Sequence, residues 1–195
     1  MGLSIHYSGS FNPTASLEGM IEEVVEIAKV YNWKYTVFET IFPQGEFDDR
    51  YDEKIYGITF TPPSCEPVFL TFLSNGRTSS SAHLKFFGNS SDKKKQKYLY
   101  MLSTKTQYGG IKTHMLIIHL LKHLSNKYLQ IFRLTDEGKY WETGDEKLLE
   151  DSFNRYNDLL NSVADALETF PVKAGETMEE YLSRLLDCVN KKRLM

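Results

Sequence analysis

Apolar residues recur at two spacings along this chain, and the spacings separate helical from extended segments. After Asn12-Pro13, apolar positions lie three and four residues apart, with glutamates between them: Leu17, Met20, Ile21, Val24, Ala28 and Tyr31. That period places them on one face of an amphipathic helix. Asn12 and Pro13 have the residue types of an N-cap and a first helical position, so they predict where this helix begins.

Alternating and short apolar runs predict strands, mostly in the middle third of the chain. They cover Leu3–Tyr7, the stretch around Trp33 to Val37, Ile55–Thr61, Val68–Leu73, Thr78–Phe87, Lys97–Ser103, Gln130–Thr135 and Lys139–Glu142. Asn75-Gly76 predicts a type I′ hairpin, because both central residues of that turn need positive φ. In that hairpin Leu73 faces Thr78 and Phe72 faces Ser79. Asp136-Glu137-Gly138 predicts a second hairpin, with a bulge.

The last quarter of the chain shows helical spacing and two helix-start signals. Thr143 with Glu146, and Thr177 with Glu180, have the residue types and spacing of capping boxes. A long apolar stripe follows the first signal (Leu149, Phe153, Tyr156, Leu160, Val163 and Leu167), with a second row at Leu148, Leu159 and Ala166. The pattern predicts two antiparallel helices joined by a short loop.

The predicted order is β-α-β5-α-β2-α-α, which defines an α+β protein. Runs of strands with few helical crossovers favour a mostly antiparallel sheet covered by helices. We expect residues 1–195 to form a single domain, with residues 1–142 as its α+β sheet core. The C-terminal helical pair, residues 143–195, is expected to pack on that core.

Composition narrows the class of protein without naming a function. The chain has 195 residues, 41% of them hydrophobic, and a formal net charge of −3. A net negative charge argues against nucleic-acid binding, and the run Lys93, Lys94, Lys95 and Lys97 is expected to be a solvated loop. No apolar run is long enough for a membrane span, and two isolated cysteines favour a reducing, cytoplasmic location. No motif predicts a cofactor.

Three histidines lie on the helix predicted at about Ile111 to Lys127. His119 and His123 are four residues apart and could share a metal ion, but lysines surround them and no HExxH motif is present. We therefore expect no metal site there, with this pair as the alternative. His114 falls on the apolar side of the helix. It is either a buried, hydrogen-bonded residue or the catalytic candidate, as a general base.

The loop Thr104–Gly110 lies between a predicted strand and this helix. Free backbone N–H groups and the helix dipole favour anions at such a position, so Lys105, Gln107, Gly109 and Gly110 are candidate ligand-binding residues. The spacing of a phosphate-binding loop is absent, because Ile111 stands where the second glycine belongs. Cys65 lies beside Glu66, which raises rather than lowers a thiol pKa, and it is not expected to be a nucleophile.

Tyr140 and Trp141 lie among charged residues and are candidate interface anchors, or else they pack under the C-terminal helices. No polar cluster has a spacing that specifies a reaction. The first hypothesis is therefore a non-enzymatic binding or interaction module, a homo-oligomer or a partner of another protein, that uses its sheet face or helical pair. The alternative is a small-molecule or anion-binding enzyme that uses His114 and the Thr104–Gly110 loop.

Overall fold

A computed structural model describes residues 2–43, 47, 50–88, 90, 92–169 and 171–193; the side chains of residues 93 and 188–193 are not described. Cys188 and its neighbour Val189 thus lie outside the described side chains. The chain divides into two compact units, unit 1 (Met1–Leu149) and unit 2 (Glu150–Met195). How the helical pair packs on the sheet core stays a prediction.

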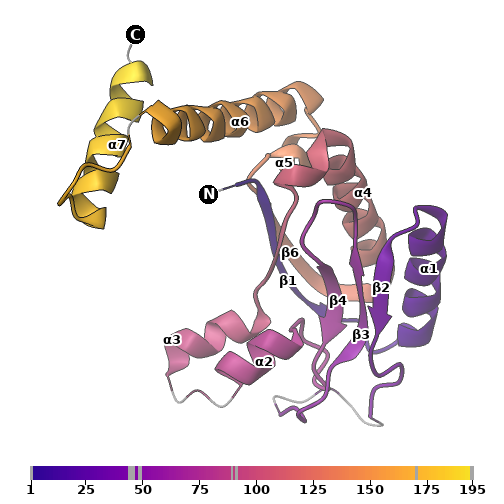
Figure 1. Ribbon diagram of the computed structural model, residues 1–195. Helices are drawn as coiled ribbons and strands as arrows, with labels where there is room; N and C mark the ends of the chain where they lie inside the picture. The colour runs from indigo at the N-terminus through magenta and orange to yellow at the C-terminus, as the bar shows by residue number, and fades with distance from the viewer. Residues whose placement is uncertain are drawn as a thin grey trace. The chain divides into compact units, whose positions relative to one another are not determined.

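Unit 1 contains two antiparallel sheets of three strands each (Figure 1). In sheet A, β1 (Ser4–Phe11) lies between β5 (Leu102–Lys105) and β6 (Leu129–Asp136). The side chains of Ile5 and Tyr7 point into the core, where they are 0% and 3% exposed. His6, between them, points to the other face, because side chains alternate along a strand.

Sheet B places β3 (Tyr56–Thr61) between β2 (Lys34–Val37) and β4 (Val68–Phe72). Opposed pairs such as Ile58 with Leu70 bury apolar side chains on one face of this sheet. Together with the helices, the two sheets confirm the predicted α+β class with antiparallel strands.

A short segment after β4 joins the two sheets. Thr78 forms a β-bridge with Phe72 of β4, and its neighbour Arg77 bridges Ser10 of β1. Tyr7 adds a side-chain link: its hydroxyl donates to the Phe69 carbonyl at 3.1 Å and accepts from the Phe69 N–H at 2.8 Å. Burial raises the pKa of Tyr7 to about 12, so this hydroxyl remains a donor at all ordinary pH values.

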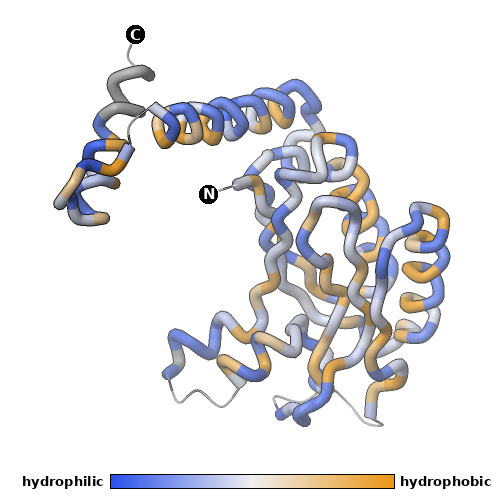
Figure 2. The backbone as a smooth tube through the Cα atoms, viewed as in Figure 1, coloured by the Kyte–Doolittle hydropathy of each residue, from blue (hydrophilic) through white to orange (hydrophobic). Residues whose placement is uncertain are grey.

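Helices α1 (Leu17–Val30) and α4 (Gly110–Tyr128) cover the sheets, α1 on sheet B and α4 on sheet A. Figure 2 shows the apolar stripe of α1 turned toward the strands. The helix begins later than predicted, because Ser16 is the N-cap and accepts from the Gly19 N–H. Asn12 instead forms a local turn in which its side chain accepts from Thr14.

The Asn75-Gly76 turn forms, but its predicted type and register are wrong. Only Gly76 has positive φ, at 74°, whereas a type I′ turn needs it at both residues. The Gly76 N–H donates to the Leu73 carbonyl, and the Leu73 N–H donates to the Arg77 carbonyl. Phe72 consequently faces Thr78 rather than Ser79.

The strand predicted at Thr78–Phe87 is mostly a helix, α2 (Ser81–Phe87). Ser80 caps it by accepting from the His83 N–H, and Leu84 with Phe87 gives the i, i+3 pair that packs against the core. The lysine run is likewise α3 (Lys93–Gln96), not a loop. Residues 97–100, predicted as strand, are the 3-10 helix η1 (Lys97–Tyr100).

The second predicted hairpin is also wrong. The chain leaves β6 and forms α5 (Tyr140–Thr143) in place of a returning strand. The Asp136 carboxylate accepts from the Tyr140 and Trp141 N–H groups and thereby satisfies the donors at the start of this helix.

The C-terminal helical pair is confirmed as α6 (Glu146–Thr169) and α7 (Met178–Arg193). Asp145, not Thr143, caps α6 by accepting from the Lys147 and Leu148 N–H groups. The capping box at α7 forms as predicted, because Thr177 and Glu180 each accept from the other's N–H.

Unit 2 has a small core of its own. It contains Ala166 of α6 and Tyr181 with Leu185 of α7, and Leu159 packs against them. The second apolar row of α6 therefore supplies the contacts with α7. Among the described residues, no helix is long and apolar enough to cross a membrane.

Candidate functional site

His114 lies at the centre of a buried row of polar side chains. Its Nδ1 is 2.7 Å from the Thr106 hydroxyl, and its Nε2 is 3.1 Å from the Asp136 carboxylate. The three residues come from the exit of β5, the first turn of α4 and the end of β6. All three are 0% exposed.

Asp136 accepts backbone hydrogen bonds in addition to its contact with His114. Besides His114, the backbone N–H groups of Gly138, Tyr140 and Trp141 donate to it at 2.7, 2.8 and 3.1 Å. Burial alone raises the pKa of this carboxyl, but His114 and the N–H groups outweigh burial, and the net pKa is lowered. The carboxylate is therefore charged, and both of its oxygens are used in hydrogen bonds within the protein.

A hydroxyl, an imidazole and a carboxylate in a row are the parts of a nucleophile and its activating base. Here the row joins three elements inside unit 1 and has no surface through which a substrate could reach Thr106. The arrangement thus fixes α4, β6 and the segment that enters β1 together, since the Thr106 N–H also donates to the carbonyl of Leu3, just before β1, at 3.0 Å.

The structure brings Lys105 and Gln107 together beside Gly2, where their side chains leave no room for a Cβ. Gln107 is 4% exposed, and its amide nitrogen and oxygen have no partner among the described residues. Gly109 lies against Cys65 Sγ, and Gly110 has φ 80° where the chain enters α4. The two glycines thus serve backbone geometry. Burial raises the pKa of Cys65 to about 11, so its thiol is protonated at neutral pH.

His119 and His123 do not converge on one point. His119 Nε2 is 3.0 Å from the Tyr140 hydroxyl, whereas His123 Nε2 is 2.6 Å from Glu23 Oε1 on α1. Within the described part of the chain, no group of three or more His, Cys, Asp or Glu side chains could hold a metal ion.

Tyr140 and Trp141 lie on α5 and are turned toward the protein. Tyr140 is 8% exposed, and Trp141 packs edge-on against Phe132 of β6 at a ring distance of 5.8 Å. Their neighbourhood therefore offers little aromatic surface to a partner.

The outer face of sheet A is open. It carries the side chains that alternate with the core residues of β1, together with their neighbours on β5 and β6. Met101 and Ile131 are 49% and 55% exposed, and Arg133 and Thr135 are also exposed. A sheet face of this kind is available for binding.

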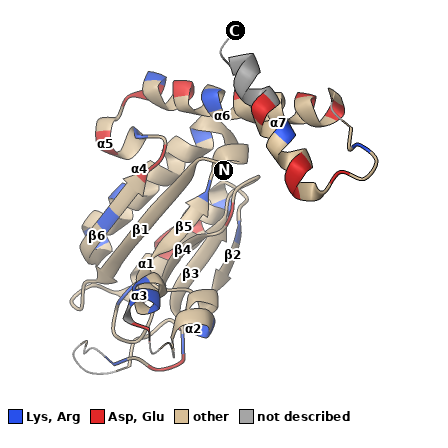
Figure 3. Cartoon of the chain, turned by 90° about the vertical axis from the view of Figure 1, so that its left-hand side faces the viewer, with Lys and Arg blue, Asp and Glu red and all other residues tan. Residues whose placement is uncertain are grey.

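A cavity of about 450 Å³ lies at one end of this face; we call it the β1–β6 pocket. Its lining residues come from β1, the Arg77 turn, η1 and β6: Ser8, Gly9, Ser10, Arg77, Lys97, Tyr100, Met101, Ile131 and Arg133. Three of them are cationic and none is acidic. Figure 3 colours basic positions blue, among them positions on β6 and α3.

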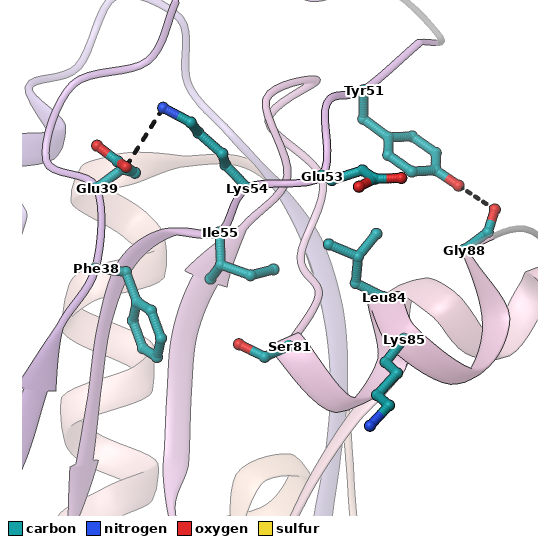
Figure 4. A pocket seen from close by; sticks show the side chains of 10 residues that line it. All are labelled: Phe38, Glu39, Tyr51, Glu53, Lys54, Ile55, Ser81, Leu84, Lys85 and Gly88. Atoms are coloured by element: carbon teal, nitrogen blue, oxygen red, sulfur yellow. Dashed lines mark hydrogen bonds and ion pairs between the residues drawn. The ribbon is translucent and has the colours of Figure 1, made fainter.

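A larger cavity, about 790 Å³, lies beside α2; we call it the α2 pocket (Figure 4). Its charges are mixed: Glu39 pairs with Lys54 at 3.5 Å, and Glu53 and Lys85 also line it. The Tyr51 hydroxyl donates to the Gly88 carbonyl at 2.6 Å across one end. This pocket lacks the uniform charge of the β1–β6 pocket.

Sequence reasoning missed both pockets, because neither is built from residues close in sequence. The β1–β6 pocket takes Arg77 from a turn, Lys97 from a 3-10 helix and Arg133 from a strand. The only available signal was the alternation along Gln130–Thr135, which places Ile131 and Arg133 on one face.

Comparisons with models of protein families, with curated proteins and with solved structures find no match to this chain.

Proposed function

We propose that this protein is a non-enzymatic binding module whose recognition surface is the outer face of sheet A. The observation that carries the proposal is the β1–β6 pocket, which joins an exposed strand face to a cavity of ligand size. Exposed apolar side chains, Met101 and Ile131, lie beside polar ones in this pocket, so it offers both apolar contact and hydrogen-bonding groups to a ligand.

The buried position of His114 supports binding over catalysis. A general base must reach the proton that it removes, within hydrogen-bond distance or through one water molecule. Both ring nitrogens of His114 already have partners inside the protein, Thr106 and Asp136. A reaction at this histidine would first have to open the junction of three elements.

Amide-resolved NMR with a library of small molecules tests the proposal. Binders are expected to shift the amide signals of Ser8, Ser103 and Arg133, which lie on the three strands of sheet A. The bound compounds are expected to remain chemically unchanged during long incubation. Ligands that shift only the amide signals of residues lining the α2 pocket would contradict the proposed surface. Turnover that disappears in His114→Ala, with the fold retained, would favour the enzyme instead.

Unit 2 supplies a second surface, for association with a second copy of the chain. Its apolar side chains outside the α6–α7 contact are exposed: Leu160 is 39%, Val163 37%, Leu167 47%, Leu182 50% and Leu186 62% exposed. Two helical hairpins commonly bury such rows against each other in a four-helix bundle. This supports a homodimer formed through the C-terminal helices.

A further inference from the structure

We propose that the β1–β6 pocket binds the phosphate group of a small organic phosphate, with Arg77, Arg133 and Lys97 as its cationic ligands. The inference rests on the proposed use of the outer face of sheet A and adds the chemical class of the ligand. It does not involve His114 or the Thr104–Gly110 loop.

The three cations come from separate elements, and no acidic partner contacts them in the part of the chain that the structure describes. Arg77 follows the Gly76 turn, Lys97 begins η1 and Arg133 lies opposite Ser8 in the register of β1 and β6. Among the described residues, none of the three forms an ion pair. Like charges placed close together repel one another, so a bound anion would relieve this repulsion.

The Arg77 guanidinium has a fixed position. It lies 3.3 Å from the centroid of the Tyr100 ring. The Tyr100 carbonyl in turn accepts from the Thr78 hydroxyl at 2.9 Å. Stacking uses the face of the guanidinium and leaves its N–H edge available, so Arg77 can donate to oxygen atoms in its own plane.

The charge of the pocket differs from that of the whole chain. The formal net charge is −3, so a general basic excess does not explain the three cations in one cavity. Lys94 and Lys95 are exposed on α3, next in sequence to the segment that supplies Lys97. This local positive field would attract a dianion, and phosphate esters carry nearly two negative charges at neutral pH.

The size of the cavity favours a small molecule over a polymer. A volume of about 450 Å³ lies within the range of roughly 300–1,000 Å³ that is typical of ligand pockets. Met101 and Ile131 provide an apolar wall beside the cations. A nucleic-acid surface would instead extend its cations along a groove that follows the phosphate backbone. An organic phosphate therefore fits better than inorganic phosphate or a polynucleotide.

Calorimetric titration at low ionic strength tests the inference with phenyl phosphate, inorganic phosphate, benzoate and a short single-stranded oligonucleotide. Phenyl phosphate is expected to bind most tightly, and inorganic phosphate more weakly. Arg77→Gln and Arg133→Gln should each weaken phenyl phosphate binding about tenfold, because each removes charge-assisted bonds to the phosphate. Ile131→Ser should reduce the advantage of phenyl phosphate over inorganic phosphate.

Arg155→Gln is the matched control, because Arg155 is exposed on α6, outside the pocket, and the variant loses the same charge. Its affinity should equal that of the unmodified protein. Equal binding of benzoate, tighter binding of the oligonucleotide, or unchanged affinity in both pocket variants would overturn the inference. If no phosphate binds but other compounds shift the sheet A amides, only the phosphate inference fails. If nothing binds this face, the proposed function fails as well.

Discussion

At the scale of single residues, the buried Asp136 shows how one side chain can determine the local fold. The sequence Asp136-Glu137-Gly138 has the composition of a hairpin turn, and that composition predicted a returning strand. The carboxylate instead accepts from the N–H groups of Tyr140 and Trp141, which start a helix. Sequence spacing could not reveal this, because His114, the partner that holds the carboxylate in place, lies 22 residues earlier.

Asp136→Asn is expected to lower the free energy of unfolding by roughly 3 kcal/mol, because the neutral amide cannot accept all the bonds of the buried carboxylate. Urea denaturation at neutral pH measures the loss. Asp151→Asn, at an exposed site on α6, is the control and should change stability little. An equal effect of the two substitutions would show that the Asp136 hydrogen bonds contribute no more to stability than an exposed carboxylate does.

The loss of stability in Asp136→Asn is also expected to depend on pH. The folded pKa of Asp136 lies below its ordinary value of 3.8, so the charged form stabilises the folded state. This stability is fully present above about pH 4 and is lost as the pH falls through the lowered pKa. The difference in stability between the unmodified protein and Asp136→Asn should therefore narrow below about pH 4.

Alanine substitutions at Gly76 and Gly144 test the backbone geometry of the Asn75-Gly76 turn. The φ of Gly76 is 74°, and a Cβ there would collide with the Phe47 ring, whereas Gly144 has φ 65° and open space around it. Gly144→Ala should cost about 1 kcal/mol from backbone strain alone. Gly76→Ala should cost about 2 kcal/mol, because crowding adds to the strain. Thermal or urea unfolding of both variants gives the comparison, and equal losses would mean that Phe47 moves aside freely.

At the scale of elements, the charged faces of α1 and α4 complement each other. In the sequence, glutamates lie between the apolar positions of α1 and lysines surround His119 and His123 on α4, with no contact predicted between the two helices. Glu23 instead contacts His123 at 2.6 Å, Lys127 at 2.8 Å and the Tyr128 hydroxyl at 2.7 Å. Each helix was correctly predicted from its own spacing, but their pairing depends on the tertiary fold, which the spacing does not contain.

Glu23→Gln should weaken this contact by about 1 kcal/mol, a modest value because Lys127 and His123 are more than half exposed. Burial alone raises the pKa of Glu23, but bonds from Lys127, Tyr128 and His123 lower it to about 2. The contribution of Glu23 is thus present above about pH 4.5 and is lost as the pH falls toward 2. Urea unfolding of Glu23→Gln across this pH range measures the loss of stability, and Glu22→Gln, at an exposed position, is the control. Equal changes in stability in the two variants would contradict the contact.

The elements also show where sequence reasoning succeeds. Strands such as Val68–Phe72 and the long helix α4 were predicted to within about a residue, because their apolar period is sustained. The failures are short elements, such as α2 and α5, whose identity depends on one side-chain cap. The β1–β6 pocket was missed for a related reason: its cations meet only after β1 pairs with β6 and the Arg77 turn closes.

At the scale of the whole molecule, the two apolar rows on α6 have different surroundings. The second row could be either more deeply buried or a partner surface, and Leu159 and Ala166 are found packed against α7. The end of the main stripe is left exposed, at Leu160, Val163 and Leu167. A homodimer through the C-terminal helices stays a prediction, and the exposed end of the main stripe is its proposed surface.

The homodimer is tested by substituting that row. Sedimentation equilibrium should give twice the 22.6 kDa chain mass for the unmodified protein. The double variant Leu167→Lys, Leu182→Lys should be monomeric, because burying two unpaired ammonium groups in an interface costs more than the contact gains. Val30→Lys, at an apolar site on α1 that is 80% exposed, adds a charge outside unit 2 and should leave the dimer intact. An unmodified protein that is monomeric at high micromolar concentration would contradict the dimer and leave the exposed leucines for a different partner.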